Sequence, residues 1–161
     1  MGVRALYEQT LQERGYTSDA AQLRAIDALE RCENEWADYK ARRSNAVTKL
    51  LVRPPIPRGV YMWGGVGRGK SFLMDCFFQA VPLTRKTRLH FHEFMREVHR
   101  ELQELKGTPN PLQELGARIA RRFRLICFDE FHVSDVTDAM ILHRLLDAIF
   151  ANRVSIVTTS N

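Results

Sequence analysis

The sequence lacks several features that would place it outside the ordinary soluble proteins. It has no uninterrupted apolar run of the roughly 18 residues that a membrane-spanning helix needs. Its first residues include Glu8 and Glu13 and no apolar block, so neither a secretory signal nor an acid-poor transit peptide is indicated. Only three cysteines are present, Cys32, Cys76 and Cys127, none in a C-x-x-C spacing, and each lies in an apolar pattern typical of buried positions. We therefore expect a cytoplasmic protein without disulfides or a transmembrane segment.

The composition is that of a folded domain. Of 161 residues, 45% are hydrophobic and 27% are charged, values close to globular averages that argue against disorder. A chain of this length forms one core of useful size. The net charge of +5 is mild and does not by itself indicate a nucleic-acid partner.

Hydrophobic periodicity divides the chain into two parts. Apolar residues recur every three or four positions from Ser18 or Asp19 to about Arg43, which predicts a long helix. Three prolines within residues 53–59 predict a linker, so we expect an N-terminal helical segment over 1–52 and a core domain over 53–161. In the core, apolar strands alternate with helices, a pattern that predicts an α/β fold with a parallel sheet covered on both faces. The expected strands are 60–63, about 88–91, 125–128 and 154–158, and the expected helices are 71–79, one ending near 105, 112–122 and 138–150.

A glycine-rich motif follows the first expected strand and precedes a helix. Its residues match the phosphate-binding pattern G-x-x-x-x-G-K-[ST] in full. Glycines let backbone N–H groups surround phosphate oxygens, and the helix presents its positive N-terminus to them. Lys70 would reach the β- and γ-phosphates, and the hydroxyl of Ser71 would bind Mg²⁺. The alternative is a flexible glycine turn before a basic helix. The predicted nucleotide-binding residues are Gly64, Gly65, Val66, Gly67, Arg68, Gly69, Lys70, Ser71 and Phe72.

Two acidic residues end the third expected strand. Asp129 would hold Mg²⁺ at the carboxyl edge of the sheet, and Glu130 would orient and deprotonate a water molecule. Such a base favours a hydrolase over a small-molecule kinase, whose substrate brings its own hydroxyl. Asn161 follows the fourth strand and is placed to contact the γ-phosphate or its water. The alternatives are an exposed acidic turn for the pair and a polar strand cap for Asn161.

Several stretches of the chain carry a family resemblance. They are 58–61, 64–75, 90–95 with Val98-His99, 127–131, Ser134-Asp135, 138–142 and 159–161, and they cover most of the chain from Arg58 onward. Residues 90–95 form an H-F-H-E-F-M block that is far more specific than a phosphate loop alone. Together these stretches resemble the ZapE-like AAA+ ATPases, a family that acts at the bacterial division ring and has mitochondrial relatives.

The resemblance carries implications for mechanism and partners. It makes 64–71 the Walker A loop, Asp129 and Glu130 the Walker B pair, and Asn161 the sensor asparagine, with ATP and Mg²⁺ as ligands. It implies the strand order 2-3-4-1, self-association, and FtsZ as a partner at the division ring. The family continues with a fifth strand, an arginine finger and a helical lid. A chain ending at Asn161 is therefore expected to bind ATP and to hydrolyse it slowly.

Two other clusters offer alternatives. His90, His92 and His99 lie close enough in the sequence to suggest a metal site, but no cysteine or carboxylate trio at zinc spacing accompanies them, and we expect packing instead. An arginine cluster at 118, 121, 122 and 124 could bind DNA phosphates as in helicase loaders, or form a solvated helix face. Phe123 is the one aromatic residue among these arginines, too few for the aromatic interleaving that supports single-strand stacking, so we do not expect nucleic acid. Three function classes stay open: a division-linked ATPase, a DNA-binding loader and a nucleotide-binding protein that acts by contact.

Overall fold

The computed structural model describes residues 1–51, 53–63 and 68–160. The chain forms two compact units, Met1–Thr84 and Arg85–Asn161, and each is described by itself. The predicted division into residues 1–52 and 53–161 stays a prediction. Within the described ranges, no helix is both long enough and apolar enough to cross a membrane.

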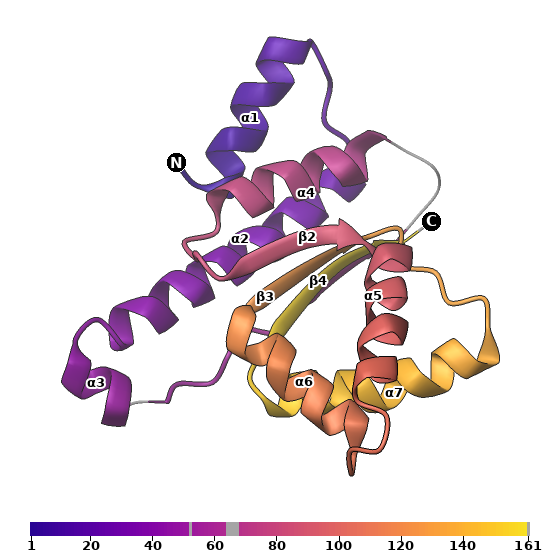
Figure 1. Cartoon of the computed structure of the whole chain (residues 1–161). Coiled ribbons are helices and arrows are strands. Elements are labelled where there is room, and N and C mark those ends of the chain that lie inside the picture. Colours follow the sequence, from indigo (N-terminus) through magenta and orange to yellow (C-terminus); the bar gives the residue numbers. More distant parts are fainter. Residues whose placement is uncertain (52, 64–67, 161) are drawn as a thin grey trace. The chain divides into compact units, whose positions relative to one another are not determined.

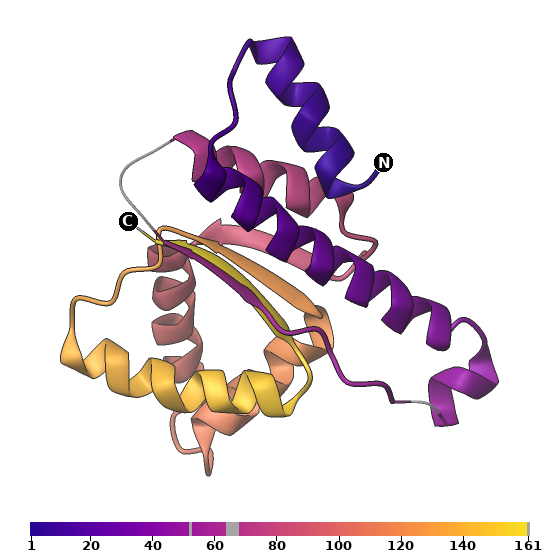
Figure 2. The ribbon, with the colours of Figure 1, turned by 180° about the vertical axis from the view of Figure 1, so that it is seen from behind.

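The first unit is built around two helices that pack on a third. Its elements are α1 (Val3–Arg14), α2 (Ala20–Arg42), α3 (Ala46–Leu51), β1 (Val60–Trp63) and α4 (Arg68–Ala80). Helices α1 and α2 contact each other and α4, and α2 also contacts β1 (Figures 1 and 2). The predicted start of α2 is confirmed, because the carboxylate of Asp19 accepts a hydrogen bond of 2.8 Å from the N–H of Gln22.

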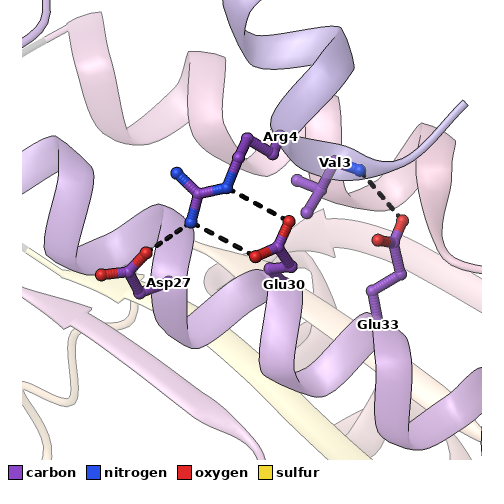
Figure 3. A network of polar contacts seen from close by, with 5 residues as sticks. All are labelled: Val3, Arg4, Asp27, Glu30 and Glu33. Atoms are coloured by element: carbon purple, nitrogen blue, oxygen red, sulfur yellow. Dashed lines mark hydrogen bonds and ion pairs between the residues drawn. The ribbon is translucent and has the colours of Figure 1, made fainter.

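Helix α1 was not predicted from the sequence, and it is attached to α2 by polar contacts. Figure 3 shows the guanidinium of Arg4 between the carboxylates of Asp27 and Glu30. Its Nε donates to Oε2 of Glu30 over 3.2 Å. The carboxylate of Glu33 accepts a hydrogen bond of 3.0 Å from the N–H of Val3. Since Gly2 offers no side chain to cap α1, this carboxylate satisfies one of the N–H groups that the start of a helix leaves without an intrahelical partner.

The second unit contains a parallel sheet. Its elements are β2 (Lys86–His90), α5 (Phe91–Glu104), α6 (Pro111–Arg122), β3 (Leu125–Asp129), α7 (Val136–Ala151) and β4 (Ser155–Ser160). Strand β3 pairs in parallel with β2 on one side and with β4 on the other. The order β2-β3-β4 agrees with the predicted order of these strands, and the parallel α/β fold class is confirmed.

Helices α5, α6 and α7 cover one face of these strands (Figures 1 and 2). On that face Phe128 lies beside Leu89, and Ile126 lies beside Ile156. The second strand was expected to reach Phe91, which was wrong. Strand β2 ends at His90, and Phe91 begins α5 because its ring packs in this core, 5.7 Å from that of Phe128. All three cysteines are buried as predicted.

Candidate active site

The helix after the glycine-rich motif begins inside the motif. Residues 64–67, which include Gly64, Gly65, Val66 and Gly67, lie outside the described residues, and so does Asn161. Helix α4 begins at Arg68, earlier than the predicted start at Ser71. Its first turn therefore holds Gly69, Lys70 and Ser71, at the positive end of the helix dipole. This positive helix end is suited to bind an anion.

The first turn of α4 is closely packed on its neighbours in the first unit. A Cβ atom on Gly69 would lie 2.4 Å from Nε2 of Gln22, so any larger residue here would require the end of the Gln22 side chain to move. Phe72 is 5% exposed, and its ring lies 5.4 Å from the ring of Tyr7. The predicted binding residues Gly69 and Phe72 thus lie where α1 and α2 hold the start of α4.

In the second unit, Asp129 ends β3 and binds an arginine from β2. Nε and a terminal nitrogen of Arg88 donate to the two carboxylate oxygens of Asp129 over 2.8 and 3.1 Å. The register pairs Arg88 with Cys127 and His90 with Asp129, so Arg88 and Asp129 lie diagonally on one face of the sheet. Both side chains are mostly buried, at 21% and 12% exposed. The bidentate geometry fixes the carboxylate.

Glu130 has an unusual backbone conformation at the end of β3. Its φ is 56°, in the left-handed region that non-glycine residues seldom occupy. Thr159 of β4 holds this turn: its hydroxyl accepts from the N–H of Glu130 over 3.3 Å, and its carbonyl accepts from the N–H of Phe131 over 2.8 Å. Oε2 of Glu130 lies 3.7 Å from Nδ1 of His90, beyond hydrogen-bond distance.

Sequence reasoning did not identify Arg88 or Thr159. Arg88 alternates with His90 along β2, and its place beside Asp129 follows only once β2 is known to pair with β3 in this register. Thr159 lies in the matching stretch 159–161, but no role was predicted for it. Lys70 and Ser71 belong to the first unit, whereas Asp129 and Glu130 belong to the second. The assignment of all these residues to a site remains a proposal.

The histidine cluster and the arginine cluster, which the sequence offered as alternative sites, contact residues near them. The rings of His90 and His92 stack at 5.6 Å, and His99 lies 2.7 Å from a carboxylate oxygen of Asp138. In the described part of the chain, no group of three His, Cys, Asp or Glu residues is arranged to hold a metal ion. Arg118 and Arg121 both pair with Glu114, at 3.5 and 3.6 Å. The predictions on zinc and nucleic acid stay predictions.

The fold and the motif together define a class of protein. A parallel sheet in an α/β fold, a complete phosphate-loop sequence that follows β1 and extends into the first turn of α4, and an acidic pair at the end of β3 are the features of an AAA+ P-loop protein. The sequence model of the AFG1-like ATPases matches residues 1–161. The chain belongs to the AFG1-like ATPase family.

Relatives and a solved structure agree with this assignment. The chain is 55% identical to the cell division protein ZapE of Escherichia coli over 104 residues, which cover 65% of this chain and 28% of ZapE. It is 40% identical over 129 residues to a protein of Schizosaccharomyces pombe, covering 76% of this chain and 28% of that protein. The chain thus spans less than a third of these relatives. The crystal structure of DnaI shares the fold, with a TM-score of 0.54 at 17% identity, over 89% of this chain and 68% of DnaI.

Proposed function

We propose that this chain binds ATP through Gly64 to Phe72 and takes part in its Mg²⁺-dependent hydrolysis. The observation that carries the proposal is the phosphate-loop sequence between strand β1 and helix α4, with Gly69, Lys70 and Ser71 in the first turn of the helix. That turn offers backbone N–H groups, a lysine cation and a hydroxyl, which are the groups that bind phosphate and its metal ion. Membership of an ATPase family supports the same conclusion.

Each remaining residue has a proposed role. Lys70 would bind the β- and γ-phosphates, and Ser71 and Asp129 would supply oxygen ligands of the kind that Mg²⁺ prefers. Because both oxygens of Asp129 accept from Arg88, a cation at this carboxylate would compete with the guanidinium. Glu130 would orient and deprotonate the attacking water, and Asn161 would contact the γ-phosphate.

The biological setting is proposed from similarity. The relative in Escherichia coli is described as a cell division protein, and we propose that this chain belongs to a cytoplasmic protein acting in division. Self-association and contact with FtsZ, which the family resemblance implies, are part of the same proposal. The alternative is a DNA-binding loader, and the pairing of Arg118 and Arg121 with Glu114 is what a solvated helix face would also show.

Calorimetric titration with ATP, with and without Mg²⁺, tests the proposal. We expect saturable binding of one ATP per chain that strengthens with Mg²⁺. A chain that shows no heat of binding for ATP at millimolar concentration under both conditions would contradict it. A parallel anisotropy titration with single-stranded DNA at low and high salt tests the loader alternative, for which affinity should fall steeply with salt.

A further inference from the structure

A pocket of about 340 Å³ opens beside the start of helix α4. Its wall combines the end of α1, the α1–α2 connection and the first turns of α2 and α4, all within the first unit. Two of its residues, Gly69 and Phe72, belong to the predicted phosphate-binding segment. The other lining residues that matter here are Tyr16, Thr17 and Gln22. The pocket is therefore continuous with the turn that we propose to hold phosphates.

The amide of Gln22 is held in place at this wall. Its Oε1 accepts a hydrogen bond of 2.9 Å from the hydroxyl of Tyr7, which also bonds to the hydroxyl of Ser18. Tyr7 is 1% exposed, so this support is fixed within the packed interface of α1 and α2. Nε2 lies against Gly69. A carbonyl oxygen has a second lone pair, so the amide keeps one acceptor and its N–H donors for a ligand.

Besides the amide of Gln22, the pocket offers aromatic side chains, on which a flat ring can stack. The ring of Tyr16 stands edge-on to that of Phe72, with centroids 6.4 Å apart, and Tyr16 remains 42% exposed. Phe72 is buried and makes the pocket floor apolar. A wall that combines aromatic rings with one oriented amide is typical of sites that bind small molecules by one flat face and one polar edge.

We propose that this pocket binds the adenine ring of the nucleotide, with Gln22 reading its edge and Tyr16 stacking on its face. An amide pairs with adenine through the N6 amino group and N7, so Oε1 and Nε2 of Gln22 match adenine and not guanine, which carries an acceptor at position 6. The inference rests on the proposed function, because it takes the phosphates to lie at the N-terminus of α4. It assigns recognition of the base to a segment about 45 residues before the phosphate loop in the sequence.

Calorimetric titrations with ATP, GTP and inorganic tripolyphosphate separate the base from the phosphates. We expect the unmodified chain to bind ATP at least about fivefold more tightly than GTP. Gln22→Ala should weaken ATP binding by roughly tenfold and leave tripolyphosphate binding unchanged. Tyr16→Ala should weaken ATP binding by roughly threefold to tenfold, because stacking on one face of the adenine is lost. Tyr16→Phe retains the aromatic ring and should bind ATP normally.

A control variant and thermal melts distinguish a loss of binding from a loss of folding. Gln9→Ala removes an amide from an exposed position of α1 and should change none of the three affinities. Thermal melts identify any variant that fails to fold, and Tyr16→Ala tests the pocket without touching the Tyr7–Gln22 bond. Equal affinities for ATP and GTP, or normal ATP binding by both Gln22→Ala and Tyr16→Ala, would overturn the adenine site while the phosphate site stands. A chain that binds none of the three compounds would refute the phosphate site itself and the adenine site with it.

Discussion

Arg88 and Asp129 form a bidentate ion pair across strands β2 and β3, with both carboxylate oxygens accepting from the same guanidinium. Asp129 is the residue to which sequence reasoning assigned Mg²⁺. The guanidinium neutralises this mostly buried carboxylate and fixes its orientation. We infer that Arg88 positions the proposed metal ligand and that it yields one or both oxygens when a cation binds.

Replacing Arg88 should destabilise the fold measurably. Arg88→Met removes the partner of a carboxylate that is 12% exposed, and leaving such a group unpaired costs about 1 to 3 kcal/mol of unfolding free energy. A double-mutant cycle with Asp129→Asn, followed by urea unfolding, should give a coupling energy of at least about 1 kcal/mol. Arg100→Met is the matched control, since Arg100 pairs with Glu97 and Glu104 at the surface and should cost little. Additive effects of Arg88→Met and Asp129→Asn would contradict the pairing.

The sequence was informative where one local signal determines the structure. Asp19 begins α2 as its capping side chain predicts, and the apolar run of β3 lies where periodicity placed it. Helix α1 escaped detection because only Val3 and Tyr7 of its residues are buried, and its attachment depends on carboxylates of α2 that are distant in sequence. The end of β2 was misplaced because Phe91 is apolar in either a strand or a helix, and packing against Phe128 decides between them.

The same contrast applies to the candidate site. The phosphate-loop residues and the acidic pair follow from short motifs whose spacing is local. The Arg88–Asp129 pair and the support of Gln22 by Tyr7 depend on register and helix packing, which no short motif encodes. For that reason sequence reasoning named the residues expected to contact phosphate and metal, and missed the residues that orient them.

Lys70→Ala should weaken ATP binding without unfolding the chain. Loss of a charged hydrogen-bond donor to phosphate lowers affinity by at least about tenfold. Lys70 lies in the first turn of α4 and not among the buried core residues, so the melting temperature should stay close to that of the unmodified chain. Titration calorimetry and thermal melts measure the two effects, with Lys106→Ala in an exposed loop as the control. Unchanged ATP affinity in Lys70→Ala would contradict the phosphate-loop assignment.

Glu130→Gly should leave the fold intact and stabilise it slightly. At φ 56° a side chain costs roughly 1 kcal/mol that glycine avoids, although glycine also gains freedom in the unfolded chain. We expect the free energy of unfolding to rise by at most about 1 kcal/mol. Glu97→Gly, in the regular helix α5, should instead lose roughly 1 kcal/mol. Urea unfolding compares the two, and an equal loss in both variants would show that the Glu130 backbone is not strained.

Glu33→Gln should stabilise the chain at neutral pH and have no effect in acid. Burial raises the pKa of Glu33 above its ordinary value of 4.5, and nearby Glu30 raises it further, whereas the N–H of Val3 and the N-terminal ammonium group lower it. A carboxyl whose pKa is raised on folding binds more protons in the folded state. Its stabilising contribution is therefore complete below pH 4.5 and is lost as the pH rises through the raised pKa.

The glutamine variant separates this charge effect from the hydrogen bond in Figure 3. Its amide oxygen can still accept from the N–H of Val3, but it carries no charge to desolvate. The melting temperature of Glu33→Gln should exceed that of the unmodified chain at pH 7, and the two should converge as the pH falls toward 4. Glu8→Gln, an exposed change on α1, serves as the control and should leave the melting temperature unchanged at both pH values. A Glu33→Gln chain that melts lower at pH 7 would mean that the carboxylate holds α1 on α2 through its charge, and that burial is the smaller effect.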